Sequence, residues 1–225
     1  MKNEIPVYDI SSISSFRQED IFISRFGIYS INHKHLHYAH RHNFYHIVFF
    51  TEGSGTQAID FQNFEVKPYQ IYFMIPGQVH SWNFDGPADG FVVNFSATFF
   101  QSFLLLSDYL EKFSFFGGIA EDSVLNLPED AGKEVFAVFE ELLKQASGNK
   151  KFSVDYIRVL LLEIFIKVSG FTVEKEEYYV SSYNYTALKN FQQLIEKNFT
   201  TLKLPKEYAE LLYITPNHLN ALSND

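Results

Sequence analysis

The chain has 225 residues, no cysteine, a formal net charge of −9 and 46% apolar residues. This composition excludes intrinsic disorder, because it supplies a packed core for one large domain, or for a domain with a smaller appendage. The lack of cysteine excludes a disulfide scaffold, a thiolate zinc site and a cysteine nucleophile. We expect a soluble, cytoplasmic protein, since the N-terminus lacks a signal-peptide core and the most apolar stretch, Val159–Val168, is too short to span a bilayer.

Five short apolar runs in the first 95 residues predict β-strands. They are Phe22–Tyr29, Phe44–Thr51, Gln57–Phe61, Ile71–Ile75 and Gly90–Phe95. β-branched and aromatic residues dominate these runs, and segments rich in Gly, Pro and Asp separate them. Strands this short, with both faces apolar, predict a sandwich or small barrel over residues 1–97.

The histidines are concentrated in one segment, with six of the eight between positions 33 and 46. Side chains alternate between the two faces of a strand, which divides the six into two sets. The sets are His33, His35 and His37 on one face, and His40, His42 and His46 on the other. His80 follows a turn that can return it to the cluster.

Two histidine-bearing motifs in this region resemble those of the cupin barrel, an antiparallel jelly-roll. The first is His40-Arg41-His42 followed by His46, and the second is Pro76-Gly77-Gln78-Val79-His80. The chain departs from the family at three positions. His46 replaces the metal-binding glutamate, Tyr69 the leading glycine, and Ile75 the usual proline.

Three interpretations of the cluster are open. The favoured one is an apolar-lined pocket whose polar and aromatic groups bind a small organic effector, a sugar being one candidate. The residues expected to bind it are His40, His42, Tyr45, His46, Tyr72, His80 and Trp82. The second is a metal site of four imidazole nitrogens, for which the ligands would be His40, His42, His46 and His80. The third is a structural or surface role, and our expectation is that no cofactor is required.

After Phe95 the apolar residues recur at helical spacing. Leu104–Phe113 predicts a short helix and Gly132–Ser147 an amphipathic one. Ser153 is the expected N-cap of a further helix, which ends before Gly170 and is apolar on more than one face. We therefore predict a helical hairpin over residues 98–175 that packs on the barrel and joins two subunits in a homodimer. Complete burial within one subunit is the alternative.

The C-terminal segment predicts three short helices. Thr186–Phe199 is amphipathic, Pro205 lies in the first turn of a second helix, and Thr215 is the expected N-cap of a third. Ala209 is the small residue expected where the last two helices cross. Two short helices joined by a tight turn are typical of a helix-turn-helix, although an ordinary three-helix cap produces the same pattern.

The run Ala209–Asn220 resembles the first helix-turn-helix of AraC-family transcription regulators. That family has a cupin barrel, a helical hairpin, a linker and this motif in the same order, so the resemblance covers essentially the whole chain, with the linker at 176–185 and the motif within 186–225. It implies an α+β protein, a jelly-roll followed by all-α segments, that is a ligand-responsive DNA-binding regulator and not an enzyme. The residues that it places at DNA are Thr215, Asn217, His218 and Asn220.

The charge of the tail bears on DNA binding. Residues 181–225 carry four lysines and four acidic residues, so the whole net charge of −9 lies in residues 1–180. Because Lys and Arg replace the counterions of phosphate, a neutral tail predicts weak DNA binding by this chain alone. The family has a second helix-turn-helix, and the chain ends at Asp225 before one, so we expect a fragment or an early-ending gene. The alternative functions are a metal-dependent cupin enzyme and a non-enzymatic sugar-binding module.

Overall fold

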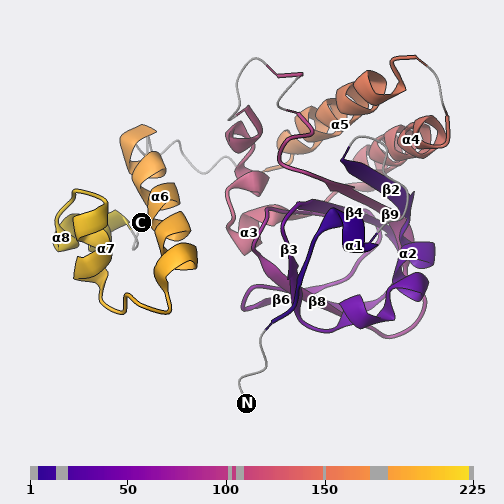
Figure 1. Ribbon diagram of the computed structural model, residues 1–225. Helices are drawn as coiled ribbons and strands as arrows, with labels where there is room; N and C mark the ends of the chain where they lie inside the picture. Colours follow the sequence, from indigo (N-terminus) through magenta and orange to yellow (C-terminus); the bar gives the residue numbers. More distant parts are fainter. Residues whose placement is uncertain are drawn as a thin grey trace. The chain divides into compact units, whose positions relative to one another are not determined.

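The computed structural model describes residues 5–13, 20–100, 103–104, 109–148, 151–172 and 182–222. The chain divides into two compact units, Met1–Thr172 and Val173–Asp225 (Figure 1). No helix within these described ranges is long and apolar enough to cross a membrane.

Two five-stranded sheets form the larger unit. Their strand orders are β1-β3-β8-β5-β6 and β10-β7-β4-β9-β2. The strands are β1 (Val7–Tyr8), β2 (Ile21–Arg25), β3 (His40–His42), β4 (Tyr45–Glu52), β5 (Gly55–Ile59), β6 (Gln62–Glu65), β7 (Gln70–Met74), β8 (Val79–Phe84), β9 (Asp89–Phe95) and β10 (Val124–Asn126). Neighbouring strands pair antiparallel, apart from the parallel pair β1 and β3. The predicted α+β class with an antiparallel jelly-roll is confirmed.

Helices precede, interrupt and follow the strands. In the larger unit they are α1 (Ile10–Ile13), α2 (Phe26–Asn32), α3 (Ala120–Ser123), α4 (Glu129–Ala146) and α5 (Ser153–Ser169), with 3₁₀ turns η1 (Lys34–His37), η2 (Tyr109–Lys112) and η3 (Ser114–Phe116). In the smaller unit they are α6 (Ser182–Asn198), α7 (Pro205–Leu211) and α8 (Pro216–Leu222).

β4 shows why the strands are apolar on both faces. Val48 and Phe50 face the interior of the jelly-roll, whereas Ile47 and Phe49 face a second core beneath the helices. There the ring of Phe49 stacks on Phe139 of α4, with ring centroids 5.3 Å apart. The two long helices α4 and α5 lie side by side over this sheet, so its outer face is as buried as its inner one (Figure 1).

The strand predicted at Phe22–Tyr29 is wrong in its second half, because β2 ends at Arg25 and α2 begins at Phe26. Phe26 and Tyr29, three residues apart, both point into the jelly-roll core, which is the spacing of a helix and not of a strand. Asp89 Oδ1 accepts a hydrogen bond of 2.8 Å from the Gly27 amide in the first turn of α2.

Other boundaries also differ from the sequence predictions. The first histidine set does not share a strand face, because residues 34–37 form η1. Ser153 is the first residue of α5 and not its N-cap; Phe152 holds that position, with φ of 69°. The predicted helix at 104–113 is described only in part, as η2. The linker at 176–185 lies outside the described residues up to 181, and its remainder is the first turn of α6.

The smaller unit has its own core around Tyr208, Ala209 and Leu219. Ala209 is fully buried and lets α7 and α8 approach. The turn after α7 is closed by two hydrogen bonds, from the Tyr213 amide to Glu210 O and from the Ile214 amide to Ala209 O. Tyr213 has φ of 55° at the position where glycine is usual, so this turn has the bonding pattern of a Schellman motif without glycine.

Thr215 caps α8 as predicted, since its Oγ1 accepts a hydrogen bond of 3.1 Å from the His218 amide. Replacing Thr215 with Ala is expected to destabilise the helix by about 1 kcal/mol, or roughly fivefold in local opening. Hydrogen exchange at the His218 amide measures this opening. Thr215→Ser keeps the acceptor and should exchange at the wild-type rate; equal rates for Ala and wild type would contradict the cap.

Candidate functional site

Four buried imidazoles meet inside the jelly-roll. β3 and β8 pair with His40 opposite His80, and their ring centroids are 4.2 Å apart. His42 lies on the same face of β3 as His40, because strand side chains alternate. His46 comes from β4 in the other sheet, and its ring is 5.0 Å from both His42 and His80. None of the four is more than 2% exposed.

His46 belongs to a continuous hydrogen-bond chain. Trp82 Nε1–H donates to Tyr72 Oη at 3.0 Å, and Tyr72 Oη lies 3.1 Å from His46 Nε2. His46 Nδ1 lies 2.6 Å from Asn94 Oδ1, which can only accept, so the proton of His46 belongs on Nδ1 and Tyr72 donates to Nε2. Both nitrogens of His46 are therefore engaged, and they are not donors for a metal ion in this arrangement.

The other three histidines lack hydrogen-bond partners for most of their ring nitrogens. His40 Nδ1 donates to Tyr38 O at 2.7 Å, which leaves Nε2 as an acceptor. Within the described part of the chain, that Nε2 and both ring nitrogens of His42 and His80 have no hydrogen-bond partner. An unmet buried polar group costs about 1–3 kcal/mol. Among the residues that the structure describes, these three side chains form the group that could hold a metal ion.

Burial keeps the cluster neutral at physiological pH. It lowers the pKa of His40 to about 4 and that of His46 to about 3, and it holds the pKa of His42 and His80 well below the usual 6.5. The nearby imidazoles lower these values further, since each disfavours a positive charge on its neighbours. Burial also raises the pKa of the Tyr72 hydroxyl, so it remains a neutral donor.

Replacing an unsatisfied imidazole with an apolar side chain is expected to stabilise the metal-free protein. His42 stacks on Phe44 with ring centroids 4.3 Å apart, so His42→Leu retains apolar contact while it removes two unpartnered nitrogens. We expect a gain of about 1–2 kcal/mol in the presence of a chelator. Urea unfolding at pH 7 measures it, and a loss of stability beyond 1 kcal/mol would show that these nitrogens are satisfied in solution.

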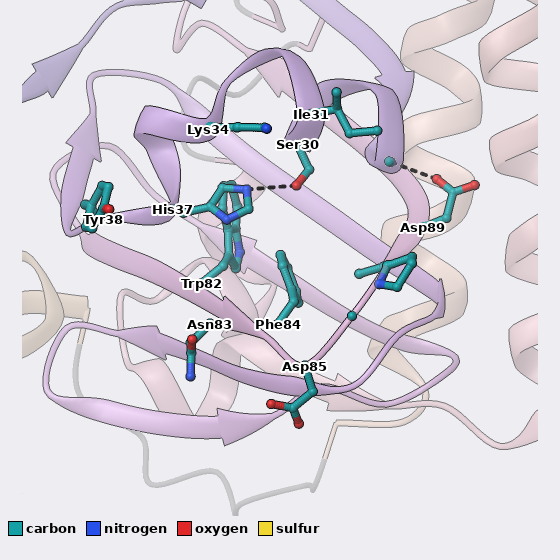
Figure 2. A pocket seen from close by; sticks show the side chains of 14 residues that line it. Ser30, Ile31, Lys34, His37, Tyr38, Trp82, Asn83, Phe84, Asp85 and Asp89 are labelled. Carbon is teal, nitrogen blue, oxygen red and sulfur yellow. Dashed lines mark hydrogen bonds between the residues drawn. The ribbon is translucent and has the colours of Figure 1, made fainter.

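A pocket of about 960 Å³ lies beside the cluster. Residues of α2 and η1 form one side of it, and β8 with the following turn forms the other (Figure 2). Ser30, Lys34 and His37 supply polar groups, and Ser30 Oγ lies 2.9 Å from His37 Nε2. Trp82 separates the pocket from the imidazoles, because it lines the pocket while its ring lies 4.9 Å from His80.

The structure places the predicted ligand-binding residues unequally around this pocket. Trp82 lines it, whereas the four histidines and Tyr72 lie behind Trp82 in the interior. Tyr45 lies apart from the site, since it faces the outer core and stacks on Phe95 at 4.9 Å. Its odd position on β4 puts it on the opposite face from His46.

Sequence reasoning missed Ser30, Lys34 and His37, because the histidine segment was treated as a strand with His37 on the face opposite His40, His42 and His46. The helical spacing of Phe26 and Tyr29 was the available signal.

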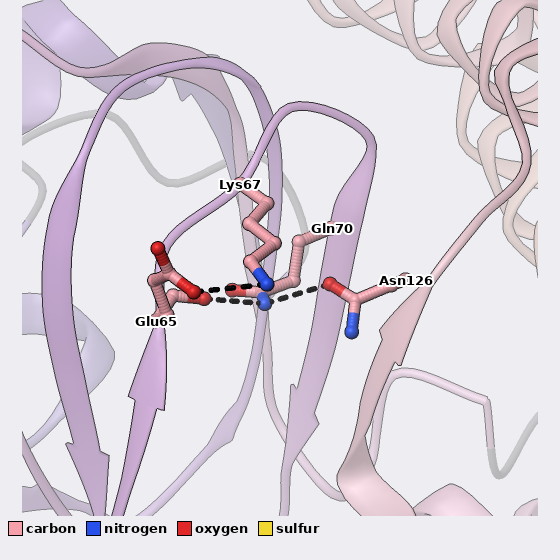
Figure 3. Close-up of polar contacts among 4 residues, drawn as sticks. All are labelled: Glu65, Lys67, Gln70 and Asn126. Carbon is pink, nitrogen blue, oxygen red and sulfur yellow. Dashed lines mark hydrogen bonds and ion pairs between the residues drawn. The ribbon is translucent and has the colours of Figure 1, made fainter.

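A second buried polar group lies among β5, β7 and β10. Gln70 Nε2 donates to Glu65 O at 2.8 Å and to Asn126 Oδ1 at 2.9 Å, while Lys67 pairs with the Glu65 carboxylate (Figure 3). Gln57 Nε2 donates to Gln70 Oε1 at 2.9 Å. The network ties the short strand β10 to the sheet and is not connected to the pocket.

Three of the predicted DNA-contacting residues lie on α8, and the fourth, Thr215, lies directly before it. Asn217 and Asn220 are exposed, whereas His218 is half-buried. Thr215 uses its hydroxyl as the helix cap. Leu219 and Leu222 face the core, so the opposite side of the helix is the one available to a partner.

The jelly-roll, with its pocket beside a buried histidine and aromatic interior, defines a cupin-like domain. Residues 22–163 match the profile of the family described as the AraC-like ligand binding domain, and the chain belongs to that family. No curated protein matches the sequence significantly.

Similar solved structures include an AraC-like transcriptional activator, ToxT and a ribosomal oxygenase. The AraC-like transcriptional activator CuxR is 15% identical, with a TM-score of 0.40; the match covers 81% of this chain and 61% of CuxR. This chain thus spans about three fifths of that relative. ToxT from Vibrio cholerae, bound to an unsaturated fatty acid, is 8% identical over 93% of this chain and 75% of ToxT, with a TM-score of 0.44. The Escherichia coli ribosomal oxygenase YcfD is 14% identical over 66% and 37%, with a TM-score of 0.24.

Proposed function

We propose that this protein is a non-enzymatic, ligand-responsive transcription regulator. In this proposal a small organic molecule binds in the pocket beside Trp82, and occupancy changes how the smaller unit meets DNA. The observation that carries the proposal is the pocket itself, in a domain of the AraC-like ligand-binding family, next to a continuous chain of hydrogen bonds from Trp82 to Asn94. A ligand can shift an equilibrium only through differential affinity, so the effector must favour one arrangement of the units.

The chemistry of the pocket supports an amphipathic effector. Trp82 and Phe84 supply aromatic surface to the lining, and Ser30, Lys34 and His37 supply polar groups beside the carboxylates of Asp85 and Asp89. A sugar matches this pairing because its C–H faces stack on aromatic rings while its hydroxyl groups need donors and acceptors. A small organic acid matches it less well, because Asp85 and Asp89 line the same pocket and outnumber the Lys34 ammonium group.

We infer that α5 joins two copies in a homodimer. Three apolar side chains of α5 are exposed: Tyr156 by 44%, Val159 by 47% and Ile166 by 58%. Val159 and Ile166 follow Tyr156 by three and ten residues, which places all three on one side of the helix. Val159→Glu puts a charge in that stripe and should shift the protein to monomer in sedimentation experiments at micromolar concentration. Phe61→Glu introduces the same charge at a fully exposed apolar position in the turn between β5 and β6, away from α5, and is the control. A wild-type protein that stays monomeric at every concentration would remove this part of the proposal.

We propose that α8 reads bases through Asn217 and Asn220, since Asn bonds well to adenine in the major groove. DNA recovered by the protein from a random pool provides the probe for a mobility shift. Asn220→Ala should weaken binding about 10- to 100-fold, with relaxed specificity at one position. Asn63→Ala, on β6 of the larger unit, should leave binding unchanged. Binding without sequence preference and without salt dependence would contradict the proposal that α8 reads DNA bases.

A further inference from the structure

We propose that His40, His42 and His80 bind one divalent transition-metal ion of the Zn²⁺ or Co²⁺ type. The proposal stands apart from the regulator function, because metal binding is measured directly. It rests on a cluster of buried imidazole nitrogens that no group of the described residues satisfies. Neutral imidazole is the ligand form that zinc, cobalt, nickel and copper prefer.

The environment of His40 is that of a metal ligand. Its Nδ1–H donates to the Tyr38 carbonyl at 2.7 Å, which fixes the tautomer and leaves the Nε2 lone pair free. Metal-ligating histidines almost always hold their second nitrogen in this way, with a backbone carbonyl or a carboxylate. Among the described residues, the buried Nε2 has no hydrogen-bond partner, so its lone pair is available to a cation.

The three side chains are close enough to share one ion. One nitrogen from each of the three lies within 4.8 Å of the others. Metal–nitrogen bonds of about 2.0–2.1 Å place tetrahedral ligand atoms roughly 3.3 Å apart, so the donors need to close by no more than about 1.5 Å. Side-chain rotation provides that movement, since β3 and β8 already hold His40 and His80 directly opposite each other.

The donor set also defines what completes the site. Three imidazoles carry no charge, and His46 is committed to Tyr72 and Asn94. The buried polar side chains of the described residues include no carboxylate. A bound divalent cation would therefore keep its full charge in a low-dielectric interior, which favours an anion in its remaining coordination position. We propose that a small anion fills that position, and azide is the probe for it.

Cobalt titration tests the site. Protein with its affinity tag removed is stripped with a chelator, returned to buffer and titrated with Co²⁺ while the visible d–d absorption is followed. We expect one equivalent to bind and azide to change the spectrum. His42→Leu and His80→Leu should each weaken binding by at least about 100-fold, since even second-shell changes cost 10- to 100-fold. His35→Ala removes an exposed histidine of η1 and should bind as wild type does.

Thermal unfolding provides a second measurement that needs no spectrum. Co²⁺ should raise the melting temperature of the wild type and of His35→Ala, but not that of His42→Leu, whose metal-free form is expected to be folded. Binding of less than about a tenth of an equivalent to folded wild type would overturn the metal site, because a built site binds stoichiometrically. Unchanged affinity in both leucine variants would also overturn it, and a spectrum insensitive to azide would overturn the anion position.

Discussion

The metal-free protein is expected to lose about 5 kcal/mol of folding free energy between pH 7 and pH 5.5. The cause is the four buried histidines, whose pKa values burial holds below 6.5 in the folded state. Unfolded, each takes up a proton near pH 6.5; folded, each stays neutral. The contribution of these histidines to the folding free energy is therefore complete above pH 6.5 and decreases as the pH falls. Between pH 7 and pH 5.5 each histidine loses a little over 1 kcal/mol.

The limits of this effect follow from the same pKa values. The pKa of His40 is about 4, so His40 still resists protonation at pH 5.5, and its contribution stops falling only near pH 4. Tyr29 and Tyr72 add nothing in this range, because burial raises their pKa values and they stay neutral throughout.

Urea unfolding at pH 7, 6 and 5.5 in chelator measures the dependence. His80→Leu should reduce the loss by about a quarter, since it removes one of four equivalent groups. His35→Ala should leave it unchanged, because His35 is exposed. If the urea concentration at the unfolding midpoint is the same at pH 7, 6 and 5.5, the imidazoles are hydrated or already charged in the native protein.

Replacing Phe165 of α5 with Ala is expected to cost about 4 kcal/mol. Phe165 is fully buried and holds the hairpin on the outer sheet. Its ring meets six other phenylalanines with centroids 5.2–6.5 Å away, namely Phe73, Phe95, Phe100, Phe113, Phe115 and Phe116. Truncation leaves a cavity that these large rings, held by both sheet and helix, cannot close.

Phe61→Ala is the matched control, because the same substitution is made at a fully exposed position in the turn between β5 and β6. It should change stability by less than about 0.5 kcal/mol. Chemical denaturation at neutral pH compares the two. If Phe165→Ala lowers the free energy of unfolding by less than about 2 kcal/mol, α5 is only loosely packed on the sheet. The jelly-roll would then have no rigid connection to the exposed apolar stripe of α5.

The strands and long helices were predictable from local pattern, and the exceptions have physical reasons. Val48 and Phe49 belong to one continuous apolar run because both faces of β4 are buried. The jelly-roll interior covers Val48, and the helices cover Phe49. Phe26 and Tyr29 follow directly on a true strand, and their β-favouring aromatic character concealed a helical spacing. The glycine-like turn at Tyr213 was set by two backbone hydrogen bonds that no sequence pattern reports.

For the candidate site, side-chain parity predicted that His40, His42 and His46 share one interior. The same rule excludes Tyr45 from that interior, so the prediction of Tyr45 as a binding residue was wrong. Spacing alone did not show which histidines are satisfied. His46 is occupied because Asn94, almost fifty residues away, lies directly opposite it on β9. That pairing, and the position of Trp82 between pocket and cluster, depend on the register of the sheets.

Fluorescence of Trp82 tests most directly the claim that the jelly-roll is the effector-binding unit. The chain has one tryptophan, and it forms the wall of the pocket. A small molecule that raises the melting temperature should change Trp82 emission in a saturable, one-site manner, with the same Kd that the thermal shift gives. A stabilising ligand that leaves Trp82 emission unchanged at saturation would contradict the account.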